Sequence, residues 1–332
     1  MAEEQVKSKS RHPARGILVT VLLVLVTMAS VSFLAIYQLA KAEAYARYIG
    51  IKNVSAERIA KIIRGTEINA NNIFDEVSSH LDNSEGVINA MRAKANLNYD
   101  VRGYFAAFAP NYFPDKGTWF EPYIYQPEHG GFEYKQVGGA RHNYTKSPWY
   151  LRAMDTGHSF WADPYYYYDG TSMSGHYCTF IKPIFDNQGN LACVCGADLK
   201  FEWLSRELDW GDEANRNNKV LNKYLPNTEH DLFTVILGKD GSCLAHPENK
   251  TITITDEKVL KDMEHKLSGM TEMEVNNVPC TVYYGPIEYI DWTVAVVVPQ
   301  EDLLSPLMPI ALGLLILIII GLIIVWLICR KL

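Results

Sequence analysis

Residues 180–199 read FIKPIFDNQGNLACVCGADL, two apolar runs on either side of the turn-forming sequence Asp186-Asn187-Gln188-Gly189. Apolar runs of this length around a turn that contains Gly predict a β-hairpin. The pattern returns at residues 233–247, FTVILGKDGSCLAHP, where Asp240-Gly241 supplies the turn. The two hairpins form a faint internal repeat, and they predict two mixed α/β units.

The first unit is rich in aromatic residues, because residues 99–177 hold 13 of the 20 tyrosines. The strand-like runs of this unit include the two strands of its hairpin, and Gly- and Pro-containing turns separate them. They lie at residues 103–110, 120–127, 131–137, 174–185 and 191–199, with a short helix at 201–210. The second unit adds a helix at 255–266 and strands at 278–287 and 292–299. We expect domains at 96–225 and 226–302.

The segment before these units, residues 41–95, has apolar side chains at helical spacing, among them Ile59, Ile63, Ile73 and Phe74. This stripe predicts a long helix that residues 83–86 could interrupt. The predicted helix continues directly from the apolar segment 16–40. This continuity favours a stalk, which would couple an outer domain to the membrane. An ordinary packed helix is the alternative.

Residues 16–40 and 303–329 contain no charged side chain. Each stretch exceeds the ~20 residues that cross a bilayer as a helix, so a soluble globular protein is excluded. Basic residues in the tails 1–15 and 330–332 predict that both tails are cytoplasmic, which leaves 41–302 outside. A cleaved signal peptide is the alternative for the first stretch. Its apolar region usually spans only ~7–15 residues, so an uncleaved anchor is favoured.

The charge balance excludes a nucleic-acid binder, since the whole chain carries a formal net charge of −7. Without its two tails the chain keeps 25 Lys and Arg against 36 Asp and Glu. Catalytic, cofactor and metal sites are not predicted, because no phosphate loop or nucleophile turn is present. Cys243 and His246 have a metal-like spacing, but a second ligand pair is missing.

Five cysteines lie between the spans: Cys178, Cys193, Cys195, Cys243 and Cys280. An odd number cannot pair completely within one chain. Cys193 and Cys195 share one face of a strand, and hairpin pairing is expected to bring Cys178 near Cys195. A disulfide there and buried free thiols both remain open.

Four motifs follow one another in the aromatic unit. They are Tyr144 followed by Trp149-Tyr150, Trp161-Ala162-Asp163-Pro164-Tyr165, Pro183 to Gly189, and Gly196-Ala197-Asp198-Leu199. With the order span, long helix, larger module, smaller module and span, the sequence resembles the double Cache (dCache) sensor domain of bacterial transmembrane receptors. The resemblance implies an α+β fold: a long N-terminal helix and two PAS-like Cache modules with antiparallel sheets, flanked by two transmembrane helices.

The resemblance also implies a small-molecule pocket in the membrane-distal module, lined by the aromatic unit. The candidate ligand-binding residues are Tyr144, Trp149, Tyr150, Trp161, Tyr165, Tyr167, Tyr177 and Asp198. Aromatic rings can hold an ammonium by cation–π attraction, and Asp198 offers a carboxylate. If the hairpin turn is centred at residues 187–188, Tyr177 faces Asp198 directly. Core packing for the tryptophans and a helix N-cap role for Asp198 are the alternatives.

One departure from the family pattern bears on the ligand. Amino-acid-binding members carry an Arg two residues before the Trp-Tyr pair and an Asp two residues after the Pro-Tyr pair. Here these positions are Ser147 and Tyr167. Free amino acids are therefore disfavoured, whereas amines, other small metabolites and short acids remain open as ligands.

The sequence thus predicts the sensor of a bacterial receptor in the cytoplasmic (inner) membrane, with a periplasmic or extracellular ligand-binding part. The stalk and second span would carry the signal to a cytoplasmic output domain, absent from this chain, or to a separate partner. A homodimer through the stalk is the expected assembly. The rival function is a non-signalling, surface-exposed binding or scaffold protein. An extracellular enzyme is not expected, because the sequence shows no set of nucleophile, acid and base residues that would converge at an active site.

Overall fold

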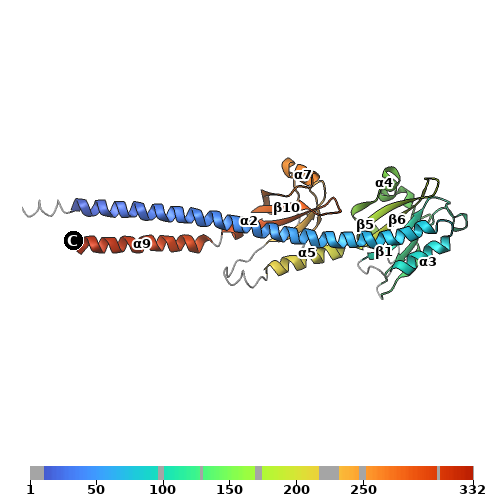
Figure 1. Ribbon diagram of the computed structural model, residues 1–332, viewed down its shortest axis with the longest axis horizontal. Coiled ribbons are helices and arrows are strands. Elements are labelled where there is room, and N and C mark those ends of the chain that lie inside the picture. The colour runs from blue at the N-terminus through green and yellow to red at the C-terminus, as the bar shows by residue number, and fades with distance from the viewer. Residues whose placement is uncertain are drawn as a thin grey trace, which may run out of the picture.

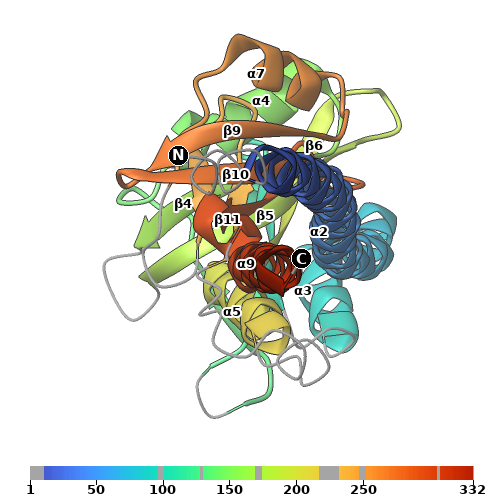
Figure 2. The same cartoon turned by 90° about the vertical axis from the view of Figure 1, so that its left-hand side faces the viewer.

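The computed structural model describes residues 11–95, 101–127, 130–168, 174–216, 232–246, 252–304 and 307–331. The molecule is elongated, with helix α2 (Arg11–Ser79) along its length and two sheet modules beside the C-terminal half of that helix (Figure 1). Helix α9 (Leu307–Lys331) lies beside the N-terminal part of α2, and Figure 2 shows the two helices side by side in the end-on view.

Both of these helices contain an apolar window long enough to cross a membrane, in the ranges Val19–Ser79 and Leu307–Ile328. Neither window is buried in the protein, and Leu23 and Leu317 are 62% and 64% exposed. The two candidate membrane helices flank the sheet modules in the sequence and project from the same end of the molecule (Figure 1).

Helix α2 runs without a break from its apolar window into the predicted stalk. Its apolar stripe, which includes Ile63 and Phe74, is fully buried against the membrane-distal sheet. The helix break falls at residues 80–83, three residues earlier than the predicted segment 83–86, and the two share only Asn83. Helix α3 (Ser84–Lys94) then begins with Asn83 as its cap, because the Asn83 side chain accepts hydrogen bonds from the next backbone amides.

The distal module is built on a six-stranded antiparallel sheet with the order β3-β2-β1-β6-β5-β4. Its strands are β1 (Val101–Phe108), β2 (Pro122–Tyr125), β3 (Glu133–Gln136), β4 (Phe160–Tyr168), β5 (Ser174–Phe185) and β6 (Leu191–Lys200). Its short helices are η2 (Pro114–Lys116), η3 (Tyr144–Lys146), α4 (Pro148–Thr156) and α5 (Phe201–Arg216). Alternate residues of β6 divide between two cores: Ala197 packs toward α2, and Val194 packs toward α4.

The proximal module has a five-stranded antiparallel sheet with the order β8-β7-β11-β10-β9. Its elements are β7 (Phe233–Leu237), β8 (Cys243–Ala245), α7 (Glu257–Glu264), β9 (Gly269–Val275), β10 (Val278–Pro286), β11 (Thr293–Pro299) and α8 (Gln300–Leu304). The predicted fold class is confirmed, since a long helix and two separate antiparallel sheets are present. Strands β4 and β9 and helix α4 were not among the predicted elements.

The predicted register of the first hairpin is wrong. Thr179, not Tyr177, lies opposite Asp198, and Tyr177 lies opposite Lys200. The loop spans residues 186–190, and a β-bulge at Ile184/Phe185 adds one further residue to the β6 side. Together they shift the pairing by two residues, which preserves the face on which each side chain lies.

The five cysteines outside the candidate spans are free thiols. Cys178 and Cys195 share the face toward α2, as predicted, but they are not neighbours: Cys178 lies opposite Leu199, and Cys195 lies opposite Lys182. The closest pair is Cys193 and Cys195, with 3.8 Å between their sulfur atoms.

Candidate ligand-binding site

The cavity in the distal module is organised around Asp198, on the face of the sheet turned away from α2. The neighbours of Asp198 across the sheet are Gly103 on β1 and Thr179 on β5. Gly103 has no side chain, so the ring of Tyr123 lies over it. A Cβ atom at Gly103 would stand 2.5 Å from that ring and 2.6 Å from its hydroxyl. The glycine thereby lets Tyr123 reach Asp198.

Both carboxylate oxygens of Asp198 accept hydrogen bonds within the sheet. The Thr179 hydroxyl donates to Oδ1 over 2.7 Å, and the Tyr123 hydroxyl donates to Oδ2 over 2.9 Å. The Tyr165 hydroxyl lies 2.8 Å from the Thr179 hydroxyl. These contacts come from β2, β4 and β5 and not from α5, so they do not support the helix-cap interpretation. Burial raises the pKa of Asp198 to about 6, although the hydrogen bonds from Thr179, Tyr123 and Tyr165 lower it.

A second carboxylate, Glu121, lines the same cavity just before β2. It is only 3% exposed, and its Oε2 atom makes no hydrogen bond within the described part of the chain. The Nε2 atom of His142 lies 3.4 Å from this oxygen. Burial raises the pKa of Glu121 well above its usual range, and the negative charge of Asp198 raises it further. The cavity therefore holds two carboxyl groups whose ionised forms are disfavoured without a cation.

Aromatic rings form most of the remaining wall. The residues around the cavity are Phe105, Glu121, Tyr123, Val137, His142, Trp149, Tyr165, Tyr167 and Asp198. The rings of Phe105 and Trp149 pack with their centroids 5.0 Å apart, and His142 meets Tyr167 edge-to-face at 5.6 Å. The cavity volume is about 30 Å³, which is space for a water molecule and not for a metabolite.

The structure brings four of the eight candidate residues to this cavity: Trp149, Tyr165, Tyr167 and Asp198. Tyr144 and Tyr150 are buried behind it in the same core, with ring centroids 5.5 Å apart. The Tyr144 hydroxyl donates to the backbone oxygen of Phe108 over 2.6 Å. These two tyrosines support the wall of the cavity from behind.

The other two candidates do not line the cavity. Trp161 packs on the α2 face, where its indole nitrogen donates to Glu67 over 2.9 Å. In a regular strand Trp161 and Tyr165 would share a face, but a β-bulge between Ala162 and Tyr165 reverses it. Tyr177 lies opposite Tyr165, buried next to the cavity. Successive residues of a strand face opposite sides of the sheet, and Tyr166, between the two cavity tyrosines, is 61% exposed.

Sequence reasoning missed Glu121, Tyr123, Phe105 and His142. The sequence could have predicted that Glu121 and Tyr123 face the same side of the sheet, because they are two residues apart at a strand. Their approach to Asp198 depends on β1 lying between β2 and β6, an order that local sequence does not reveal.

The segment that contains the cavity matches a known family. Residues 87–206 match the model of the methyl-accepting chemotaxis protein-like, first PDC sensor domain. This match includes all eight candidate residues and Glu121. The family consists of sensor domains, which are not catalytic in themselves. No curated protein sequence matches the chain significantly.

Solved structures with the same fold are also sensor domains. The periplasmic sensory domain of the Campylobacter jejuni chemoreceptor Tlp1 has a TM-score of 0.64 at 13% identity, over 80% of this chain and 99% of that chain. The extracellular domain of soHK1S-Z6, a protein assigned as a histidine kinase, has a TM-score of 0.60 at 18% identity, over 81% and 98%.

A third structure contains a ligand. It is the ligand-binding domain of the Pseudomonas fluorescens chemoreceptor CtaA in complex with L-isoleucine, with a TM-score of 0.53 at 16% identity, over 81% of this chain and 98% of that chain. The fold and the matched segment confirm the resemblance to dCache sensor domains. The chain therefore carries an extracytoplasmic-type sensor domain between two candidate membrane helices.

Proposed function

We propose that this chain is the sensor of a bacterial receptor in the cytoplasmic membrane, and that its distal cavity binds a small primary amine. The observation that carries the proposal is the pair of buried carboxyl groups, Asp198 and Glu121, inside an aromatic wall. The described residues around the cavity include no Lys or Arg. An ammonium group would stabilise the ionised carboxyls and would stack against the rings.

An amine fits the site better than an α-amino acid does. CtaA and the C. jejuni chemoreceptor Tlp3 are solved with L-isoleucine and L-norvaline, so the fold accommodates ligands of this size. In this chain Ser147 and Tyr167 occupy the positions at which the amino-acid-binding subset has Arg and Asp. A ligand carboxylate would therefore meet Asp198 and Glu121 without a Lys or Arg partner in the described wall of the cavity.

Binding must enlarge the cavity, because about 30 Å³ cannot hold an amine with several carbon atoms. The residue best placed to move is His142, which is 28% exposed at its side chain and lies outside the sheet on a short turn closed by the bridge Gly139–His142. The rival scaffold function is favoured by the same small volume. A binding measurement distinguishes the sensor from the scaffold. A scaffold whose core is filled by its own side chains should show no saturable binding of an amine.

Strand β4 supplies a route for the signal. Tyr165 and Tyr167 lie in the cavity, whereas Asp163 accepts a hydrogen bond from Trp292 of the proximal module, and Trp161 donates to Glu67 of α2. Displacement of the two tyrosines by a ligand would thus act on the proximal module and on the stalk. We also propose that both tails lie in the cytoplasm and that two copies of the chain form a homodimer through the stalk. The signal would pass to a cytoplasmic output partner. We assign no catalytic activity to the chain.

The test is a thermal-shift and calorimetric screen of the full chain in detergent or nanodiscs. Amines are compared with the amino acids from which they differ by one carboxylate: tyramine with tyrosine, histamine with histidine, and ethanolamine with serine. We expect a hit among the amines and a weaker or absent response from each matched amino acid. Failure of the whole amine set, with binding of carboxylates, would reject the proposed ligand class.

A further inference from the structure

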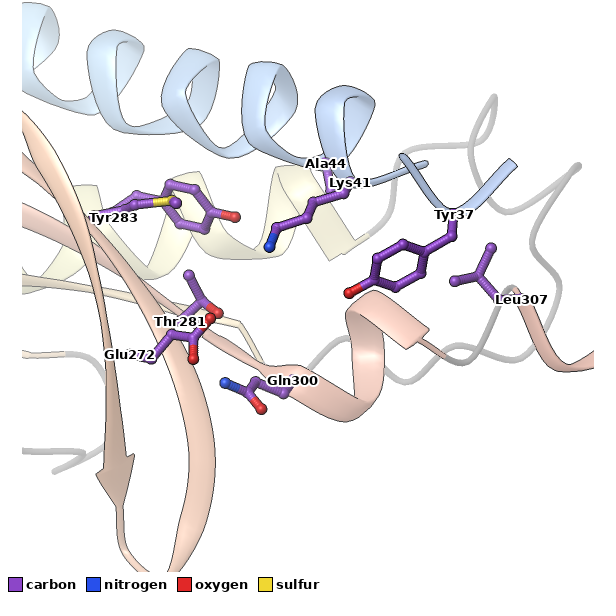
Figure 3. A pocket seen from close by; sticks show the side chains of 9 residues that line it. Tyr37, Lys41, Ala44, Glu272, Thr281, Tyr283, Gln300 and Leu307 are labelled. Atoms are coloured by element: carbon purple, nitrogen blue, oxygen red, sulfur yellow. The ribbon is translucent and has the colours of Figure 1, made fainter. Parts of the chain in front are cut away.

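A larger cavity lies at the opposite end of the protein, where the proximal module meets the candidate membrane helices. We call it the basal cavity. Its volume is about 280 Å³, and it is formed by α2, β9, β10, α8 and the start of α9. Figure 3 shows the polar ends of Lys41, Tyr37, Glu272 and Gln300 turned toward one shared space. None of these residues belongs to the distal site.

The basal cavity lies at the depth of lipid headgroups if the two spans cross the membrane. Lys41 is the first charged residue after the charge-free stretch 16–40, and Leu307 begins α9. Tyr37 lies one helical turn before Lys41 on α2. Tyrosine and lysine are the residues that membrane proteins place at the hydrocarbon–water boundary. A headgroup can enter this cavity while its acyl chains remain beside α2 and α9.

Two opposite charges line the cavity from different elements. Lys41 extends from α2, and Glu272 extends from β9, where it is paired with Thr281 of β10 (Figure 3). Lys41 and Glu272 form no ion pair with each other in the part of the chain that the structure describes. Each charge is therefore available to a ligand, and together they suit a molecule that carries both signs.

We propose that the basal cavity binds the headgroup of phosphatidylethanolamine. The phosphate would accept hydrogen bonds from the Lys41 ammonium and the Tyr37 hydroxyl. The primary ammonium, two carbons away, would donate to Glu272 and to the hydroxyl of Thr281. Phosphatidylglycerol offers no cation to Glu272, and the quaternary ammonium of phosphatidylcholine has no N–H to donate. The headgroup chemistry, phosphoethanolamine, could also come from a soluble ester, but the position between the spans favours the lipid.

The experiment is native mass spectrometry of the full chain with phosphatidylethanolamine, phosphatidylcholine and phosphatidylglycerol of identical acyl chains. Wild-type protein should prefer phosphatidylethanolamine over phosphatidylcholine by about tenfold, the effect of one charge-assisted hydrogen bond. Glu272→Gln should reduce this preference to about twofold or less. The control Glu274→Gln changes another exposed carboxylate two residues along the same strand, and it should leave the preference unchanged.

A pair of variants at Lys41 separates recognition from misfolding. Lys41→Gln should weaken binding of all phospholipids, whereas Lys41→Arg keeps a cation beside the phosphate and should retain the preference for phosphatidylethanolamine. Melting temperatures verify that each variant is folded. Equal binding of phosphatidylethanolamine and phosphatidylcholine by wild type would overturn the proposal, as would an unchanged preference in Glu272→Gln. Displacement of the lipid by equimolar soluble glycerophosphoethanolamine would overturn the lipid as the source.

Discussion

The indole nitrogen of Trp292 donates a hydrogen bond to a carboxylate oxygen of Asp163 over 3.1 Å, and this bond joins the two sheet modules. Asp163 lies in the bulge of β4, two residues before Tyr165 in the distal cavity. Trp292 is 3% exposed and directly precedes β11, the strand that leads to α8 and then to α9. The contact thus links the bulge beside the distal cavity to the strand that leads to the second candidate span.

We expect this bond to transmit ligand binding to the proximal module. Asp163→Leu removes the acceptor, and it should abolish the change in hydrogen–deuterium exchange that an amine produces in β11. Amine affinity should stay within about threefold, because Asp163 does not line the cavity. Asp163→Asn keeps an acceptor oxygen and is the matched control, with the wild-type response. An undiminished β11 response in Asp163→Leu would show that the signal takes another route.

Asp198 should make stability depend on pH in a specific direction. Its pKa rises from 3.8 to about 6 on folding, so the folded state binds the proton more tightly than the unfolded state. The free energy of unfolding therefore falls as pH rises from about 4 to about 6, by about 3 kcal/mol in total. Asp198→Asn should remove this component, as seen in denaturant titrations at several pH values. The control is Asp209→Asn, because Asp209 is exposed. Identical pH profiles for wild type and Asp198→Asn would contradict a raised pKa of Asp198 in the folded protein.

The approach of Tyr123 to Asp198 depends on the missing side chain at Gly103. Gly103→Ala places a methyl group where the Tyr123 ring lies, and it should destabilise the protein by about 1–3 kcal/mol. It should also weaken amine binding, since Tyr123 must move away from the carboxylate. Gly139→Ala is the control for the melting temperature, because its added methyl group meets open space. If both variants melt and bind like wild type, the close packing at Gly103 does not shape the site.

Glu121 should exchange a proton with solvent when an amine binds. Burial raises the pKa of Glu121, and the negative charge of Asp198 raises it further, so the protonated form is favoured while no cation is bound. An ammonium favours the ionised form, and calorimetry in buffers of different ionisation enthalpy should detect proton release. Glu121→Gln should lose part of that release and bind amines about tenfold more weakly. The control is Glu213→Gln, because Glu213 is exposed. Unchanged proton release in Glu121→Gln would show that Glu121 is not the group that loses a proton when the amine binds.

Much of the fold follows from local pattern. The helical stripe with Ile63 and Phe74 predicted the long helix, and the Asp-Asn-Gln-Gly and Asp-Gly turns predicted both hairpins. Asp198 was proposed as a cavity residue from the family resemblance. It lines the cavity although the predicted register was wrong, because a shift of two residues keeps a side chain on the same face. Trp161 was assigned to the cavity, but the structure places it against α2, because a single bulge residue reverses the face and leaves no clear mark in the sequence. Glu121 was missed because its partners come from strands distant in the chain.

The most direct test of the account is isothermal titration calorimetry of the full chain with the best amine from the screen and with its matched amino acid, on wild type and Asp198→Asn. We predict saturable binding of the amine to wild type, at least about tenfold weaker binding of the amino acid, and a loss of about 2–5 kcal/mol in binding free energy in Asp198→Asn. The exposed variant Asp209→Asn should bind like wild type. Equal affinity of wild type and Asp198→Asn for the amine would contradict the central claim that the buried carboxylate of the distal module recognises the ligand.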